Sequence, residues 1–463
     1  MRRLWFAGAL VLAVALFAVW LADQPGRLTL DVGDYRVEAP SSVGALALVL
    51  LVGGGAIGHA LVRWLVNLPR RARSRAEWRR RQRGELLLSR GMVAVAAGDR
   101  ATALRVARQV ESLLPGSPLG VLLSVQAAQL VGDEQATRRY YAAMLQKPET
   151  EFLGLRGLAM QAHRLGQKSE ALNLARRAYR LNPGTPWVLT ALFELEAEAG
   201  NWREVERVTD RAIANRVVSE SEGRRRKAVA LYEQARTAQS HGDAANAERL
   251  AGSAHKLAPD FAPATLLAVA LATARGRARV ADQLLADAWS HAPHDNLAES
   301  FLNLHVADQP DRRLVRAERL TAANTENHES RLLLARVAVE ANRLDRAEEV
   351  LAAIPRDTND ARVQRLRQEL DSARGSARRS EANLPTLPEA WRCERCGHRH
   401  ERWQALCGQC NAFDSLSWVH PVVAGAAAPQ PVRPIQPDDW AAQAEAVAPV
   451  AMVIEETPPS LGR

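Results

Sequence analysis

The sequence predicts an all-α chain in three parts: a pair of long apolar helices, a stack of shorter helix pairs, and a compact segment built round four cysteines. Three observations lead to this prediction. Two apolar stretches lie near the N-terminus, at residues 4–22 and 43–62. Turn-forming residues then recur at intervals of 34, and all four cysteines lie between Cys393 and Cys410. Aromatic residues make up only 5% of the 463 positions, which favours helices packed on small side chains over a β-sandwich.

The two apolar stretches predict a transmembrane hairpin over residues 1–68. Residues 4–22 form 19 positions without a charge, and a helix of that length spans roughly 28 Å, close to the hydrocarbon thickness of a bilayer. This run is longer than the apolar part of a typical cleaved signal peptide, and a second span follows at residues 43–62. Trp5, Trp20 and Trp64 lie near the span ends, where aromatic residues gather at membrane interfaces.

Charge predicts the orientation of this hairpin. Arg2 and Arg3 precede the first span, and residues 69–83 contain eight arginines and one acid after the second. The intervening residues 23–42 hold more acids than arginines. By the positive-inside rule, both termini are cytoplasmic and the loop is periplasmic, in a multi-pass protein of a bacterial inner membrane. The basic juxtamembrane segment 69–84 is also expected to contact anionic lipid.

The same residues argue against two other classes of function. The net charge of +9 comes almost entirely from the +7 of residues 69–83, and no aromatic platform accompanies it, so we expect no nucleic-acid binding. Gly53, Gly55 and Gly58 match the dinucleotide pattern GxGxxG, but they lie in an apolar span and not after a strand. Helix packing is the better interpretation of these glycines. No nucleophile–base pair or phosphate loop is evident, so we predict a protein without catalytic residues.

Residues 85–370 carry the strongest internal signal, a period of 34 with a single step of 42. The long step indicates an eight-residue insertion near residues 219–227. Glycine ends a first helix, small alanines let a second helix pack on it, and proline separates one pair from the next. The turns are Gly98, Gly132, Gly166, Gly200, Gly242 and Gly276, with looser ones at Pro310 and Asn342; the alanines are Ala103, Ala171, Ala247 and Ala281, then Ala178, Ala212, Ala254 and Ala288; the prolines are Pro115, Pro183, Pro259 and Pro293.

This pattern resembles the tetratricopeptide repeat. The resemblance implies an α-solenoid of seven to eight units over residues 85–370, with a concave groove that binds a peptide or helix of a protein partner. The aromatic positions of the motif are mostly missing, so Leu and Ala must supply the packing between helices. A purely structural spacer is the alternative interpretation.

A polar linker at residues 371–390 leads to the four cysteines. Cys393, Cys396, Cys407 and Cys410 form two CxxC pairs with ten residues between them. Four thiolates in two such pairs suit one tetrahedral metal ion, and a reducing cytosol disfavours disulfides. We therefore predict a zinc-ribbon or rubredoxin-like knuckle over residues 391–420 that holds a structural zinc ion, with iron as the alternative metal.

Other residues of the knuckle suggest further roles. His398 and His400 are alternative ligands, and Gly397 suits a tight turn after a ligand pair. Four aromatic residues are expected to form its small core, and residues 421–463, rich in Ala and Pro, are expected to be a disordered tail. The four aromatic residues are Trp391, Trp403, Phe413 and Trp418.

The order of two spans, a basic stretch and repeats resembles the HemY family, as do the loop residues 23–26 and 33–38. The resemblance covers the chain to about residue 370, and the knuckle is similar to an extension on some members from α-proteobacteria. It implies a membrane scaffold that recruits enzymes of late haem biosynthesis, and it leaves open whether haem itself binds. A second resemblance, to LapB, implies instead an adaptor that delivers a client to a membrane protease in lipopolysaccharide regulation. LapB-like proteins have one span, so the second span favours HemY.

Overall fold

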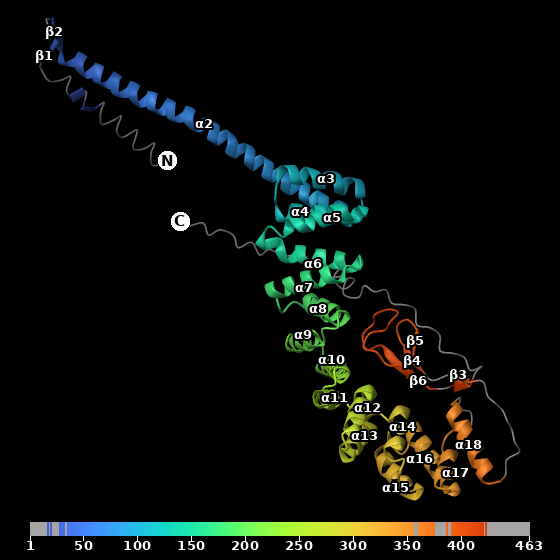
Figure 1. The fold of residues 1–463 in the computed structure, drawn as a ribbon. Coiled ribbons are helices and arrows are strands. Elements are labelled where there is room, and N and C mark those ends of the chain that lie inside the picture. The colour runs from blue at the N-terminus through green and yellow to red at the C-terminus, as the bar shows by residue number, and fades with distance from the viewer. Residues whose placement is uncertain are drawn as a thin grey trace. The chain divides into compact units, whose positions relative to one another are not determined.

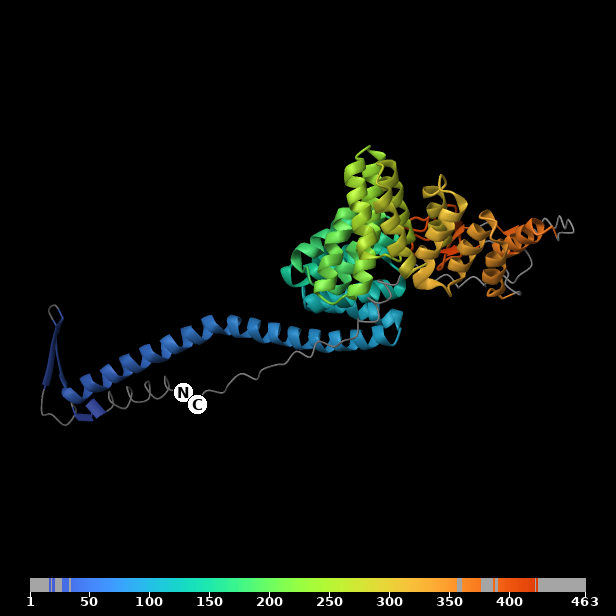
Figure 2. The same ribbon diagram turned by 90° about the horizontal axis from the view of Figure 1, so that it is seen from below.

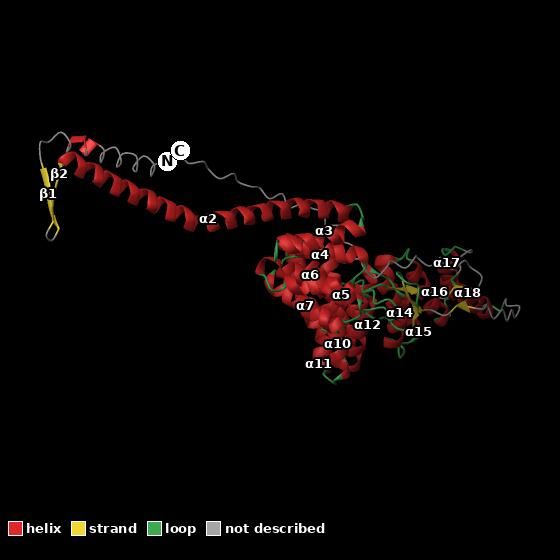
Figure 3. Cartoon of the chain, turned by 90° about the horizontal axis from the view of Figure 1, so that it is seen from above, coloured by secondary structure: helices red, strands yellow, loops and turns green. Residues whose placement is uncertain are grey.

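A computed structural model of the chain describes residues 16–17, 19–20, 27–32, 35–355, 360–375, 386–387, 390–420 and 422–423. Helices dominate the described residues, as predicted, and strands are confined to two short regions (Figure 1, Figure 3). The chain divides into two compact units, Met1–Tyr140 and Tyr141–Arg463. Each unit is described by itself.

The first unit begins with an antiparallel hairpin of β1 (Arg27–Val32) and β2 (Tyr35–Pro40), paired from Arg27↔Pro40 to Val32↔Tyr35. The sequence prediction had only a loop here. Helix α2 (Ser41–Ala96) then runs for 56 residues through the second predicted span and the basic segment. The other helices that begin in this unit are α3 (Arg100–Leu113), α4 (Pro118–Val131) and α5 (Glu134–Met144).

The structure describes only part of the two predicted membrane spans. Within the described part of the chain, no helix combines the length and the apolar character that crossing a bilayer requires. The first predicted span, residues 4–22, lies mostly outside the described residues, and so does the tail from residue 424 onward.

The second unit is itself built of helix pairs. Its helices are α6 (Pro148–Arg164), α7 (Lys168–Leu181), α8 (Pro186–Glu198), α9 (Trp202–Ala214), α10 (Glu220–Ser240), α11 (Ala244–Leu257), α12 (Ala262–Ala274), α13 (Ala278–His291), α14 (Asp295–Leu304), α15 (Pro310–Thr321), the 3-10 turn η1 (Ala322–Asn324), α16 (His328–Glu340), α17 (Leu344–Ala352) and α18 (Ala361–Ala373). No β-strand is described within residues 85–370, which confirms the helical prediction for that range.

The glycines, alanines and prolines of the repeat lie at the turns, helix contacts and helix ends that the sequence predicts, with one exception. The six turn glycines follow the first helix of each pair with φ between +71° and +82°, a backbone conformation that glycine adopts without strain. The eight alanines are between 0% and 3% exposed at the contact of the paired helices. Helices α3, α7, α11 and α13 each end two residues before one of the four prolines. At Pro310 the structure differs, because this proline is the first residue of α15 and not part of the preceding turn.

The eight-residue insertion lies entirely within one helix. Helix α10 has 21 residues, whereas α8 and α12, its counterparts in the neighbouring pairs, have 13 each. The extra residues lengthen the N-terminal end of α10, where the Ser219 hydroxyl accepts a hydrogen bond from the Glu222 N–H and caps the helix. This extension carries Arg224, Arg225 and Arg226.

The knuckle and the residues beside it contain short strands joined by turns. β4 (Ala390–Cys393) lies between β5 (Arg399–His400) and β6 (Leu416–Val419) in one antiparallel sheet, and β3 (Thr386–Leu387) pairs with β7 (Val422–Val423). The knuckle lies beside α8, α10, α12 and α14, the first helices of four successive pairs (Figure 1, Figure 2). We call the face that these four helices present to it the inner face.

Candidate metal centre

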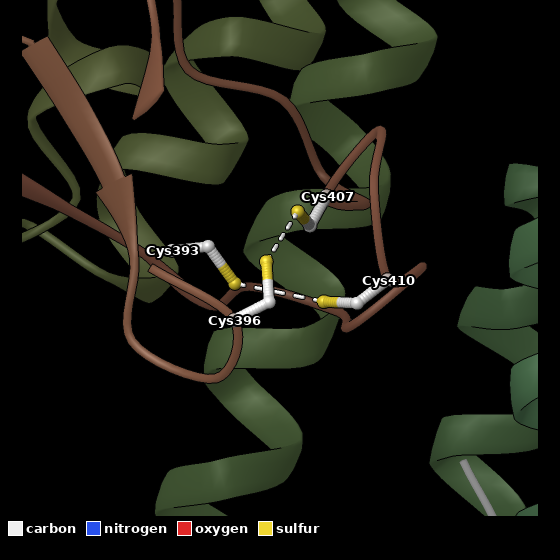
Figure 4. Close-up of side chains that lie close together, drawn as sticks. All are labelled: Cys393, Cys396, Cys407 and Cys410. Atoms are coloured by element: carbon white, nitrogen blue, oxygen red, sulfur yellow. Dashed lines mark hydrogen bonds between the residues drawn. The ribbon is translucent and has the colours of Figure 1, made fainter. Parts of the chain in front are cut away.

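The four predicted ligands come together at one point. Their sulfur atoms all lie within 4.8 Å of one another; Cys393 Sγ is 3.7 Å from Cys410 Sγ, and Cys396 Sγ is 3.6 Å from Cys407 Sγ (Figure 4). Sulfurs at about 2.3 Å from one tetrahedral ion are separated by roughly 3.8 Å. All four thiols are free, and these separations are far longer than a disulfide bond. The group can therefore hold one metal ion.

Two similar turns present the ligand pairs. After Cys396, Gly397 has φ +76° and its N–H donates to the Cys393 carbonyl at 2.9 Å. After Cys410, Asn411 has φ +53° and its N–H donates to the Cys407 carbonyl at 2.8 Å. Glycine and asparagine are the residues that adopt this left-handed conformation most readily. The predicted role of Gly397 is confirmed, and Asn411 performs the same role in the second pair.

The surroundings of the thiols favour a bound cation. Burial opposes ionisation of Cys393, but hydrogen bonds from Ser415 and from the N–H groups of Cys396 and Arg395 outweigh it and lower the pKa of this thiol to about 6. Burial raises the pKa of Cys410 to about 12. Neighbouring thiolates at this spacing repel one another, so a positive ion is needed before all four can ionise.

The two alternative ligands are not part of the sulfur group. His400 Nε2 lies 3.3 Å from Cys407 Sγ, and burial lowers the pKa of this imidazole, so the neutral ring can donate a hydrogen bond to the sulfur. His398 contributes its backbone carbonyl, which accepts the Cys393 N–H at 2.9 Å. Both histidines support ligands from outside the coordination shell.

The predicted aromatic core of the knuckle is only partly correct. Trp391 and Trp418 pack edge to face, with ring centroids 5.1 Å apart. Trp403, in contrast, packs against Tyr232 at 5.3 Å and Phe261 at 4.7 Å, both of which belong to the repeats. So small a segment cannot enclose four large rings by itself, and part of its apolar surface is buried on a neighbour instead. Phe413 likewise packs against Phe193 of α8, with centroids 4.8 Å apart.

Polar contacts fix the knuckle on the inner face. Arg225 of the α10 extension donates from Nε and Nη2 to the two carboxylate oxygens of Asp414, at 2.7 and 3.1 Å. The Trp418 indole donates to Asp295 at the start of α14, at 2.9 Å. Sequence reasoning missed Arg225 and Asp295. The eight-residue insertion that carries Arg225 was the signal for the first of them.

A charged cluster lies where the last strand of the sheet ends. Arg362 donates to Glu329 at 2.7 and 2.9 Å and to Asp360 at 2.7 Å, and it lies 3.3 Å from Asp295. The four residues lie in or immediately before the first turns of α14, α16 and α18. Burial opposes the charge on Arg362, but the carboxylates outweigh it and raise the pKa of the guanidinium. His420, which follows β6, lies within 3.7 Å of Asp295 and Glu329.

A cavity of about 540 Å³ lies between the knuckle and α8 and α10. Its wall includes Phe193 and Thr190 of α8, Arg226 of the α10 extension, and Arg395 and Cys410 of the knuckle. Charged side chains of both signs line it; Arg226 pairs with Glu222 on the same helix. The cavity therefore combines polar and apolar surface from the repeats and from the metal centre.

Comparisons with known proteins bear on the family and the fold. Residues 26–132 match the HemY protein N-terminus, and residues 307–370 match a tetratricopeptide repeat. No curated protein matches the sequence at a significant level.

Similar solved structures include a tetratricopeptide repeat protein from Parabacteroides merdae, with 18% identity over 55% of this chain and 99% of that one and a TM-score of 0.28. PilF of Pseudomonas aeruginosa has 14% identity over 52% of this chain and 99% of its own, with a TM-score of 0.27. The TPR2AB domain of yeast Sti1 in complex with pHSP90 has 12% identity over 52% and 99%, with a TM-score of 0.27.

The family matches agree with the order of elements in the chain. The HemY N-terminal match covers β1 to α4, and the repeat match covers α15 to α18. The turn glycines and buried alanines show that the helix pairs between them follow the same repeat. The chain therefore combines a HemY N-terminal domain with tetratricopeptide repeats.

Proposed function

We propose that this protein is a scaffold of the bacterial inner membrane, without catalytic activity of its own, whose repeats recruit enzymes of late haem biosynthesis. The observation that carries the proposal is the HemY N-terminal domain joined to a long repeat array. Curved arrays of stacked helix pairs offer extended surfaces for protein segments. Late haem intermediates are apolar and poorly soluble, so holding their enzymes together at the membrane is chemically favourable.

The membrane attachment in this proposal rests on the sequence. Residues 4–22 and 43–62 would form the two spans, and both termini would lie in the cytoplasm. Arg79, Arg80, Arg81 and Arg83 have exposed side chains, which supports contact of this segment with anionic lipid headgroups. Reporter fusions at Asp31 and Arg90 test the topology. Asp31 should report the periplasm and Arg90 the cytoplasm, and periplasmic activity at Arg90 would contradict the proposal.

The metal ion has a structural and not a catalytic role within the knuckle in this proposal. Four cysteine ligands leave no open position for a substrate, and such sites in proteins most often hold zinc. We propose zinc in the sulfur group, with iron as the alternative. The partner surface would include the cavity of about 540 Å³, because both the repeats and the metal-bound loop line it.

Deletion of the gene tests the proposed function. Porphyrin intermediates should accumulate or haem should fall, and the full chain should restore both. A version without residues 1–68 should bind the same partners in solution but should fail to restore haem. Normal haem and porphyrin levels in the deletion strain would contradict the proposal.

The LapB-like adaptor is the second candidate. The observation that favours it is the four-cysteine knuckle joined to the repeats, which LapB-like proteins also have. On this reading, deletion would leave haem unchanged and would alter the level of an enzyme of lipopolysaccharide synthesis. Measuring that enzyme in the same strain separates the two candidates.

A further inference from the structure

The inner face has the surface chemistry of a docking site, and the knuckle covers it. Phe193, Tyr232 and Phe261 present aromatic rings to the knuckle, and each contacts an aromatic ring there. Arg225 pairs with a knuckle carboxylate. Aromatic residues and arginine are the side chains that contribute most to protein interfaces. The knuckle therefore binds to the repeats as a protein ligand would.

We propose that the knuckle is a built-in ligand of the inner face, and that loss of its metal ion uncovers this face for a partner segment. The contacts identify the chemistry of that segment as an aromatic residue followed by an acid, the arrangement of Phe413 and Asp414. The proposal rests on the proposed function only in that the repeats bind protein, and it does not depend on haem.

The metal controls the docking residues because they lie beside the ligands. Phe413 and Asp414 follow Cys410 by three and four residues, and Trp403 precedes Cys407 by four. The strands β4, β5 and β6 have only four, two and four residues, so a bound ion would supply much of the stability of the loop that carries Phe413 and Asp414. Without the ion, the loop loses the conformation that presents its two rings and its carboxylate together.

The repeats hold their structure through contacts of their own. Ala247, Ala251 and Ala254 of α11 are fully buried among neighbouring helices. The guanidinium of Arg225 lies 4.4 Å from the centre of the Phe261 ring, and that of Arg226 lies 4.1 Å from the centre of the Phe193 ring. Both guanidinium groups belong to the repeats, so they stay beside these rings when the knuckle undocks. The uncovered face then favours a partner segment with an acidic and an aromatic side chain over a neutral apolar segment.

A peptide-binding experiment on the full chain in detergent tests the proposal. The probe is a fluorescent peptide with the chain's own residues 411–418, and its anisotropy is measured with the metal-loaded chain and with the chain after chelation. Chelation should tighten binding at least ~10-fold, because the site is then open. Arg225→Ala should abolish this gain. Arg224→Ala is the matched control, because Arg224 is on the same extension but pairs with Glu220 of its own helix, and it should preserve the gain.

A second variant opens the site without chelation. Asp414→Asn weakens the pair with Arg225, so the metal-loaded variant should bind the peptide more tightly than the metal-loaded wild type. Equal binding before and after chelation, or no binding in either state, would overturn the proposal. Loss of helical circular dichroism on chelation would also overturn it, because the knuckle would then be a structural support. None of these results involves haem, so the proposed function is judged separately.

Discussion

Arg225 and Asp414 are 189 positions apart in the sequence, and they form a two-point ion pair that joins the repeats to the knuckle. Their side chains are 32% and 15% exposed, so solvent screens this pair less than an ion pair at the surface. The guanidinium also covers the Phe261 ring. One residue of the helix insertion thus makes both a polar and an aromatic contact in the docking of the metal centre.

Arg225→Ala should weaken this docking by about 1–3 kcal/mol, because it leaves Asp414 half-buried without its cation. Hydrogen exchange in β6 and the melting temperature of the metal-loaded chain measure the effect. Arg224→Ala should stay within about 0.5 kcal/mol of the wild type. Equal effects of the two substitutions would show that the pair does not hold the knuckle.

Ala247→Phe should destabilise the repeats by about 1–3 kcal/mol, because Ala247 is 0% exposed at a helix–helix contact and the added ring overpacks it. Thermal unfolding followed by circular dichroism gives the change. Ala245→Phe places the same ring on the exposed side of α11 and serves as the control. An unchanged melting curve for Ala247→Phe would be incompatible with close packing at the repeated alanines.

The contact of His420 with the charged cluster should weaken as the pH rises. Asp295 raises the pKa of His420, and Glu329 adds to this, while burial and Arg362 oppose it. A raised pKa means that the stabilisation is complete below the ordinary histidine value of about 6.5 and is lost as the pH rises through the higher folded value. Hydrogen exchange in β6 should therefore accelerate with pH beyond its intrinsic dependence. His420→Gln should remove that excess, and an identical profile in the variant would contradict the prediction.

The sulfur group should bind one metal ion per chain, and elemental analysis of the purified full chain should find zinc. Cys393→Ser together with Cys410→Ser should abolish the binding, because each CxxC pair then loses a ligand. His400→Ala is the control, since it removes a neighbour of Cys407 but no ligand, and it should retain one ion. One iron atom per chain would identify iron, and not zinc, as the bound metal. The absence of any bound metal would contradict the prediction of a metal centre.

Local sequence signals predicted the repeats and the ligand group. A turn such as that at Gly242 needs a positive φ, and a helix contact such as that at Ala247 needs a small side chain, so both appear as residue types at fixed spacing. The two CxxC pairs are equally local, because the turn within each pair orients its own sulfurs. The single step of 42 residues between turn glycines predicted the insertion near residues 219–227, and the longer helix α10 agrees with that position.

The docking of the knuckle could not be predicted in the same way. An aromatic side chain such as Trp403 can pack within its own segment or on a neighbour, and composition does not distinguish the two. The partner of Arg225 is 189 positions away, beyond any local pattern. The β1–β2 hairpin, in contrast, has a local signal, because Leu28, Leu30 and Val32 alternate with polar residues as in a half-buried strand, although the prediction has only a loop there.

Photo-crosslinking in native membranes is the most direct test of the central claim that the repeats recruit enzymes of late haem biosynthesis through a surface that includes the cavity. A photoreactive residue replaces Thr190, which lines the cavity beside the knuckle, or Arg249, which is exposed on α11 in the second helix of its pair. The account predicts that the Thr190 probe crosslinks to an enzyme of late haem biosynthesis and that the Arg249 probe does not. Crosslinks to such an enzyme only from Arg249, or crosslinks from Thr190 only to an enzyme of lipopolysaccharide synthesis, would contradict it.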